Sequence, residues 1–178
     1  MPKVIKYIST NIKTIIAICF ILALVVFYCY KYNQTYVIQY NYDGIKYQAN
    51  NLNSGMPLQI EIDGVYKKGY FDNPDIFEGK IIINGETCYG QYGHRSYEYA
   101  FNKYKMSQIE SDSFTGSIFI DDMFKEITIE IHEFDIKGLE SFSYRNGWLI
   151  SAPSVNREQA VYISNKLIQK LHKEVNIK

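Results

Sequence analysis

The stretch that decides the fold is Ile127-Thr128-Ile129-Glu130-Ile131-His132. Its apolar and polar residues alternate, and successive side chains of a strand point to opposite faces. The three isoleucines therefore share one face, while Thr128, Glu130 and His132 share the other. A strand with one apolar face is typical of an antiparallel sheet that packs that face on a core. The stretch predicts such a sheet around it.

Turn signals on both sides of this strand extend the prediction. Three strand-like runs end at Asp63-Gly64, Asn84-Gly85 and Asn146-Gly147. Asp-Gly and Asn-Gly are the pairs that two-residue hairpin turns favour. With residues 35–42 as a first strand, we expect about seven or eight antiparallel strands without intervening helices.

One internal repeat is visible. Residues 75–84 and 112–121 share the pattern D-x-F-x-G-x-I-x-I-[ND]. One interpretation is a duplicated ligand-binding hairpin. The other, which we favour, is a device for starting a strand: the glycine permits a bend, and the phenylalanine and isoleucines point into the core.

The C-terminal segment has a helical rather than a strand period. Apolar residues recur at helical spacing from Ala160 to Val175, and Asn156 with Gln159 resembles a capping box. We predict a helix over about 156–174 that covers one face of the sheet. The fold class is therefore α+β.

The N-terminal segment predicts a membrane span. Residues 14–30 carry no charge and are mostly aliphatic, and tyrosines extend the run to residue 32. At 1.5 Å per residue, these 17 residues cover roughly 25 Å of a hydrocarbon layer about 30 Å thick. The residues at the exit of the run are too large for signal-peptide cleavage, so we expect an uncleaved anchor.

Charge places the two sides of this span. Three lysines precede the uncharged run and one follows it directly, and no acidic residue occurs before Asp43. The positive-inside rule then predicts a cytoplasmic N-terminus over 1–13, a single transmembrane helix over 14–32, and an extracytoplasmic domain over 33–178. The expected localisation is the cell membrane, with the C-terminal domain outside.

Composition excludes some function classes. The 178 residues contain 19 Lys+Arg and 19 Asp+Glu, and residues 32–178 hold 15 cations against 19 anions. A nucleic-acid partner is not expected, because such a binder needs a basic face. Cys88 is the single cysteine of the predicted outer domain, so that domain has no internal disulfide.

The segment from Cys88 to Phe101 carries the best candidate for ligand binding. Tyr92, His94, Arg95 and Tyr97 offer aromatic faces and hydrogen-bond donors in a glycine-containing loop. Such surfaces suit sugars, peptides or protein partners. An alternative is that the alternating aromatic residues at the end of this segment form one face of a strand.

Catalytic and metal sites are weaker candidates. No common nucleotide-binding, hydrolase or metalloprotease motif is present. Cys88 with His94 could act as nucleophile and base. His132 lies beside Glu130 and Glu133 and could use a carboxylate in catalysis. Together with Asp121-Asp122, these residues could instead hold a metal. We assign no catalytic residue, metal ligand or cofactor.

A resemblance adds to this interpretation. It is carried by the lysine-preceded anchor, the repeated F-x-G-x-I-x-I segment, Phe124–Ile131, and Ile150–Ala160 leading into the final helix. Together they resemble small uncharacterised membrane-anchored proteins of low-GC Gram-positive bacteria. The resemblance implies a bacterial origin and an outward-facing domain. It transfers no site residue.

Three function hypotheses follow. The leading one is a non-enzymatic module, anchored at the outer membrane face, that binds a protein partner or an envelope polymer. The second is an envelope hydrolase or transferase that uses Cys88 with His94, or a carboxylate with His132. The third is a structural component of a membrane complex.

Overall fold

The computed structural model describes residues 2–32, 34–69, 73–90, 96–134 and 140–178. The chain divides into two compact units, Met1–Gln34 and Thr35–Lys178. The first contains helix α1 (Pro2–Tyr32), so residues 14–32 are helical as predicted. In the described ranges, no helix is both long enough and apolar enough to cross a membrane.

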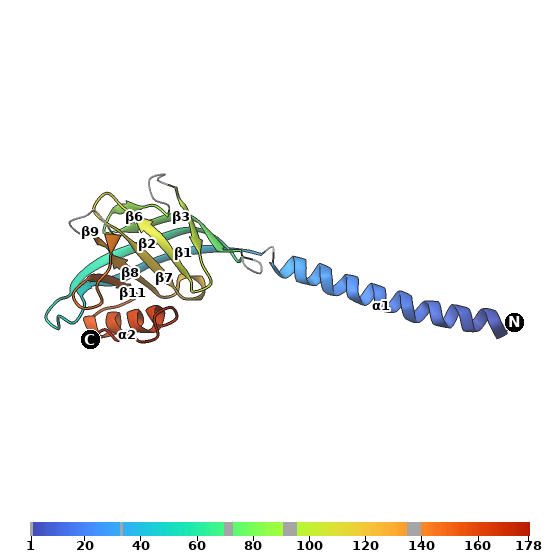
Figure 1. Cartoon of the computed structure of the whole chain (residues 1–178). Helices are drawn as coiled ribbons and strands as arrows, with labels where there is room; N and C mark the ends of the chain where they lie inside the picture. The colour runs from blue at the N-terminus through green and yellow to red at the C-terminus, as the bar shows by residue number, and fades with distance from the viewer. Residues whose placement is uncertain (1, 33, 70–72, 91–95, 135–139) are drawn as a thin grey trace. The chain divides into compact units, whose positions relative to one another are not determined.

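The second unit is an antiparallel sheet with one C-terminal helix, α2 (Arg157–Ile168) (Figure 1). The predicted α+β class is confirmed. Eight strands follow the order β4-β3-β2-β1-β11-β8-β7-β6, and β5 adds to β3 as a ninth. Their bounds are β1 Thr35–Gln48, β2 Met56–Lys67, β3 Asp75–Ile83, β4 Glu86–Cys88, β5 Glu98–Phe101, β6 Met106–Glu110, β7 Thr115–Ile120, β8 Ile127–Ile131 and β11 Trp148–Ala152. A separate hairpin pairs β9 (Glu133–Phe134) with β10 (Glu140–Ser141).

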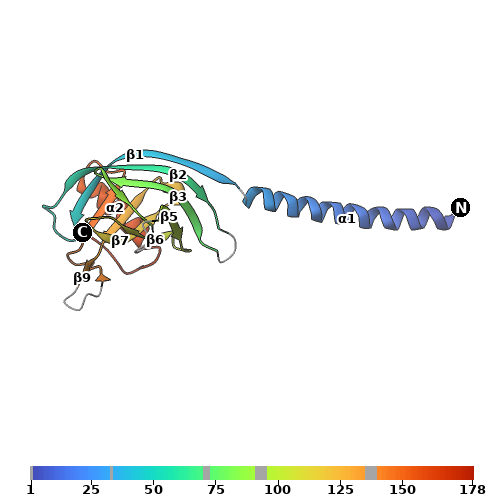
Figure 2. The same cartoon turned by 90° about the horizontal axis from the view of Figure 1, so that it is seen from above.

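The sheet curls until its two ends nearly meet, and its strands surround an interior (Figure 2). Tyr89, next to β4, and Glu110, at the end of β6, exchange both backbone hydrogen bonds at 2.7 and 2.8 Å. The Asn102 N–H donates to the Met106 carbonyl at 3.0 Å, which joins the end of β5 to β6. These contacts make the domain a nearly closed barrel.

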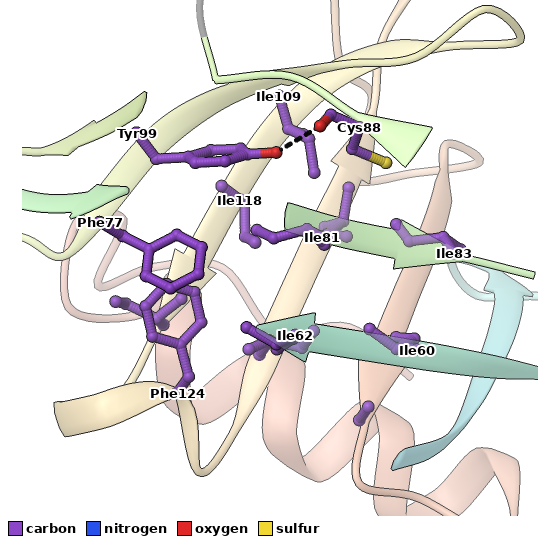
Figure 3. Packing of buried hydrophobic residues seen from close by; sticks show 14 of the residues in the cluster. Ile60, Ile62, Phe77, Ile81, Ile83, Cys88, Tyr99, Ile109, Ile118 and Phe124 are labelled. Atoms are coloured by element: carbon purple, nitrogen blue, oxygen red, sulfur yellow. Dashed lines mark hydrogen bonds between the residues drawn. The ribbon is translucent and has the colours of Figure 1, made fainter. Parts of the chain in front are cut away.

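Closure places the main core inside the barrel rather than under the helix. The inner faces of the strands supply fully buried aliphatic and aromatic residues, among them Ile62, Phe77, Ile81 and Tyr99 (Figure 3). Phe124 fills the space between aromatic rings, with its ring centroid 4.6 Å from that of Phe77. Burial of such side chains contributes about 1.5–3 kcal/mol each. The alternation of β8 is confirmed, because Ile127 and Ile129 are part of this core.

Two predicted hairpin turns are wrong. Asn146-Gly147 does not join two paired strands, because residues 142–147 lie outside the strands and β11 pairs with β1 and β8. Asp63-Gly64 is not a hairpin: β2 continues through it, and Gly64 pairs with Ile38 on one side and Gly79 on the other. A Cβ added to Gly64 would lie 2.6 Å from the Gly79 Cα, so two glycines here let β2 and β3 approach closely beneath the Phe77 ring. Asn84-Gly85, by contrast, forms the predicted turn with φ of 53° and 85°.

The repeat serves the core, as we favoured. In β3, Phe77, Ile81 and Ile83 are buried, and in β7 Ile118 and Ile120 are fully buried. The glycine of each copy lies against backbone of the next strand. A Cβ on Gly79 would clash with the Asp63 carbonyl oxygen, and a Cβ on Gly116 would clash with that of Glu130.

Helix α2 covers the outer face of the sheet at β8, β11 and β1 (Figure 1). The predicted N-cap is confirmed: the Asn156 side chain accepts from the Gln159 N–H at 2.9 Å. The predicted end at residue 174 is wrong, because the helix ends at Ile168 and the chain turns back. The Asn165 amide exchanges two hydrogen bonds with the Ile177 backbone, at 2.9 and 2.8 Å, which fixes the returning tail.

A second, smaller core lies between the helix and the sheet. It contains Leu149, Phe119 and Leu167, all buried. A buried hydroxyl network runs through it: the Ser164 hydroxyl of α2 is 2.6 Å from both the Tyr47 hydroxyl and the Ser151 hydroxyl. Because buried hydroxyls cost free energy unless they are paired, this network fixes where the helix sits.

Candidate functional site

Only part of the predicted binding loop lies among the described residues. Tyr92, His94 and Arg95 lie outside the described residues. Tyr97 is 44 % exposed, and its ring centroid is 5.4 Å from that of Tyr89 and 5.9 Å from the Lys80 ammonium. Tyr97 is therefore an accessible aromatic side chain next to the start of β5, as a binding residue must be.

Cys88 does not have the properties of a nucleophile. Its side chain is fully buried in the barrel, and the Tyr99 hydroxyl donates to its carbonyl at 2.7 Å (Figure 3). Burial, together with the charge of Glu86, raises the pKa of the Cys88 thiol to about 12. The thiolate is the reactive form, and a thiol with this pKa stays protonated near neutral pH. Cys88 is therefore not the nucleophile of the proposed pair with His94.

The metal alternative finds no support either. In the part of the chain that the structure describes, no group of three or more His, Cys, Asp or Glu side chains could hold a metal ion. Glu133 is exposed on β9 and does not join His132 and Glu130 in a cluster.

A pocket of about 490 Å³ opens at one end of the barrel, between the start of β3 and the β5–β6 turn. Its lining includes Asn73, Asn102, Lys103, Tyr104 and Lys105. This volume falls in the range of small-molecule sites.

A largely buried ion pair forms the floor of this pocket. The Lys105 ammonium donates to Asp75 and to the Tyr66 hydroxyl, the latter at 3.1 Å, and the Gly69 N–H donates to Asp75 at 2.7 Å. Burial opposes ionisation of Asp75, but these hydrogen bonds outweigh it and lower the pKa of the carboxyl below its ordinary value. The pair is therefore charged, and it holds the pocket wall to the barrel.

The backbone of the β5–β6 turn positions this lysine. Lys105 has a φ of 61°, a left-handed conformation that costs free energy in a residue with a side chain. The Asn102 side chain stabilises it by accepting from the N–H groups of Tyr104 and Met106 at 2.9 and 3.2 Å. The turn thus directs the ammonium toward Asp75, while Lys103 stays exposed.

A second polar cluster lies on the outer face of β7 and β8, which we call the outer patch: Thr115, Ser117, Glu130, His132 and Glu140. The sequence predicted that Glu130 and His132 share this face. Cross-strand register adds Ser117, which pairs directly with Glu130. The β9–β10 hairpin adds Glu140.

Three side chains of the outer patch form a chain of contacts. Ser117 Oγ is 3.0 Å from His132 Nε2, and His132 Nδ1 is 3.4 Å from Glu140 Oε1. The His132 side chain is 16 % exposed and that of Glu140 is 25 % exposed. A hydroxyl, an imidazole and a carboxylate in this order are the arrangement that activates a serine.

The outer patch also concentrates unsatisfied polar atoms. Among the described residues, four buried side-chain N or O atoms have no hydrogen-bond partner, and three of them are here: Thr115 Oγ1, Glu130 Oε1 and His132 Nδ1. Burial raises the pKa of Glu130 to about 7, although a hydrogen bond from Tyr144 opposes the shift. Such groups are rare in folded proteins and require an explanation.

Sequence reasoning missed both sets of partners. Asp75 and Lys105 are 30 residues apart in the chain, and Ser117 and His132 are 15 residues apart. Only the register of β7 against β8 places Ser117 beside His132. The signal in the sequence for this contact was the alternation within each strand, which places Ser117 and His132 on the polar faces of their strands.

No family model, curated protein or solved structure matches this chain.

Proposed function

We propose that this chain is a binding module of the bacterial cell envelope, held at the outer face of the membrane by its N-terminal helix. The ligand site is the barrel-end pocket, and the ligand is a segment of a protein or an envelope polymer that is rich in hydroxyl or carbonyl groups. The observation that carries the proposal is the pocket itself, built over the Lys105–Asp75 pair.

The electrostatics of the pocket favour a neutral polar ligand. Asp75 neutralises Lys105 at the floor, and Asp122 is 3.9 Å from the same ammonium. The side chains of Asn102 and Lys103 line the pocket with hydrogen-bonding groups. Tyr104 adds an aromatic face, over which the Lys103 ammonium lies at 5.1 Å. Aromatic rings beside polar groups are typical of sites for sugars and peptides.

Attachment to the membrane is supported by the sequence of α1. The run from residue 14 to residue 30 has no charge, and lysines flank it. Its aliphatic and aromatic side chains are exposed along the helix, with Ile16 and Phe20 both at 63 %. Large apolar side chains that are exposed along a helix are typical of contact with lipid or with another protein.

Ligand-induced stabilisation tests the binding site. The full chain in detergent is melted with cell-wall fragments, oligosaccharides and short peptides. A ligand at about 100 times its Kd adds roughly 2.7 kcal/mol, which raises Tm by several degrees in a domain of this size. We expect Lys103→Ala and Tyr104→Ala to abolish the shift.

A matched pair of residues provides the control. Lys80 and Tyr97 form the same type of cation–aromatic contact, at 5.9 Å, but lie outside the pocket. Lys80→Ala and Tyr97→Ala should leave the shift unchanged. If these two variants lose the Tm shift and the pocket variants keep it, the ligand site lies in the segment from Cys88 to Phe101 instead. A flat panel with a cooperative melt would exclude all three ligand classes.

A protease experiment tests the topology. Protease added to intact, wall-stripped cells should digest the domain from residue 35 onward, while the same domain at the inner face would be protected. A tag at residue 1 should survive in the same cells. Protection of the domain would refute attachment at the outer face.

A further inference from the structure

We propose that the outer patch is a second site with an activity of its own: Ser117, His132 and Glu140 hydrolyse carboxylic esters. This goes beyond ligand binding in the barrel-end pocket, because the two sites share no residue. The chemistry needs a nucleophile, a base and a group that orients the base, and the three side chains supply them in that order.

The first contact activates the serine. Ser117 Oγ is 3.0 Å from His132 Nε2, and we assign the imidazole the tautomer in which the hydroxyl donates to this nitrogen. Ser117 lies in the middle of β7, whose backbone pairs with β6 and β8, so its main chain is fixed on both sides. Ser117 is buried, with 9 % of its surface exposed, and the His132 side chain beside it is 16 % exposed. The hydroxyl is therefore held in place, and an ester must approach it from the more exposed side of His132.

The second contact orients and stabilises the imidazole. His132 Nδ1 lies 3.4 Å from Glu140 Oε1 and is not aligned for a hydrogen bond. Contacts of this kind are often loose in an unliganded site. When His132 takes up the serine proton it becomes a cation, and its attraction to Glu140 increases. The contact thus favours the transition state over the resting state, as a catalytic interaction must.

The reaction proceeds in two balanced steps. Ser117 Oγ attacks the ester carbonyl carbon and forms a C–O bond, while its proton passes to His132 Nε2. The ester C–O bond then breaks, and the departing alcohol takes that proton. Water attacks the acyl-serine in the same way, releasing the carboxylic acid and restoring Ser117. The net change is ester plus water to acid plus alcohol.

A donor for the developing oxyanion is available on the neighbouring strand. Gln108 of β6 is exposed and pairs directly with Ser117, so both side chains are on the outer face. We assign the Gln108 side-chain amide to this role. The unpartnered Glu130 Oε1 borders the same patch, and when its carboxyl is ionised it accepts a hydrogen bond from a hydroxyl of the ester.

Covalent labelling of the unmodified protein is the decisive experiment. The full chain in detergent is incubated with a fluorophosphonate, which reacts with activated serines, and the adduct is located by peptide mass spectrometry. We expect one adduct, on Ser117. A folded protein with no adduct at Ser117 would overturn the proposal, whatever the variants do.

Variants then separate the roles. His132→Gln should lower labelling and p-nitrophenyl acetate hydrolysis at least about 100-fold, the range for loss of a general base. Glu140 is a positioning residue, so Glu140→Gln should lower kcat with KM unchanged, and Glu140→Asp should restore part of the loss. The Tm of each variant is measured first, so that unfolding is not mistaken for lost chemistry.

An exposed serine controls for non-specific labelling. Ser113 donates to the Glu86 carboxylate at 2.6 Å but contacts no described histidine. Ser113→Ala should leave labelling and hydrolysis unchanged, whereas Ser117→Ala abolishes both. Equal labelling of Ser113 and Ser117 would mean that the probe reacts with serine hydroxyls non-specifically and would refute the assignment.

Discussion

The buried carboxyl of Glu130 links the stability of the fold to pH. It is 5 % exposed, and its pKa is raised from 4.5 to about 7, chiefly by burial. Between those values the folded chain keeps a proton that the unfolded chain has released. Its contribution to stability is therefore complete below the unfolded pKa of 4.5 and is lost as the pH rises through about 7.

This linkage gives a measurable prediction. A pKa shift of this size changes the free energy of unfolding by on the order of 3 kcal/mol. We expect wild-type stability, measured by urea denaturation, to fall between about pH 5 and about pH 7.5. Glu130→Gln, which cannot ionise, should remove most of that fall. An equal fall in both proteins would show that Glu130 titrates normally.

Cys88 supports a second prediction at the residue scale. Its side chain is buried and its pKa is raised to about 12. In a chain whose Cys19 and Cys29 are replaced by serine, a maleimide should therefore modify Cys88 only when the domain unfolds. Peptide mass spectrometry after brief labelling, with and without urea, measures this.

An exposed position in the same domain is the matched control for this labelling. Ser113 is exposed, so a Ser113→Cys variant should react rapidly in the folded protein. Fast labelling of Cys88 under the same conditions, without urea, would contradict its burial in the barrel.

At the residue scale, the sequence predicted the strand face on which a side chain lies better than it predicted the side chains that it contacts. Alternation correctly placed Thr128 and Glu130 on the outer face, and Asn156 correctly capped the helix. Alternation could not show that Ser117 lies beside His132, because this contact depends on the register of β7 against β8. Nor could it show that Asp75 reaches Lys105, because chain closure brings them together.

At the scale of elements, β1 is paired along most of one edge but only at the end of the other. It pairs with β2 from Thr35 to Lys46, but with β11 only from Ile45 to Gln48. The Asp43 carbonyl accepts from the Ser154 N–H on the β11 side, which shows that odd-numbered residues direct their backbone groups to that side. From residue 35 to residue 41 no described strand pairs with this edge.

Proline substitution tests this asymmetry. Gln39→Pro removes an N–H on the edge without a paired strand, whereas Tyr40→Pro removes one that faces β2, a position where proline is not tolerated. Relative to alanine at each position, we expect proline to cost less than about 1 kcal/mol at residue 39 and about 1–3 kcal/mol at residue 40. Urea denaturation of the four variants measures both differences. Equal costs would mean that the open edge of β1 is paired.

The elements also show why two of the sequence-based predictions are wrong. Asp63-Gly64 has the composition of a turn, yet a long-range contact with Gly79 keeps it in a strand. The helical spacing of apolar residues continues in sequence after Ile168. The chain nevertheless turns back there, and the Ile177 N–H donates to the Asn165 side chain in the returning tail. In both cases tertiary packing overrides a correct local signal.

For the whole molecule, both hydrophobic cores lie within one unit. The buried residues of the barrel core and of the core under α2 begin at Ile38. Closure of the sheet explains how a domain without a disulfide among its described residues buries enough surface to fold. The sequence predicted the helix and the strands, but not the closure of the sheet, because closure is not visible in a strand pattern.

Because the cores are contained in this way, the fragment 34–178 should fold without α1. It loses no buried residue of either core. We expect a cooperative melt, with a Tm within about 2 °C of that of the full chain in the same detergent, since a larger shift would require a lost contribution of order 1 kcal/mol. An unfolded 34–178 in circular dichroism would mean that α1 contributes to the stability of the domain.

The matched truncation removes residues 157–178 instead. It deletes Leu167 and Ile177, both buried, and leaves the hydroxyls of Tyr47 and Ser151 without Ser164. Losing buried side chains of this size costs about 2–5 kcal/mol each, which together reaches the whole stability of a typical domain. The fragment 1–156 should therefore show no cooperative melt in circular dichroism. A folded 1–156 would mean that the barrel core alone stabilises the domain, and that the core under α2 is dispensable.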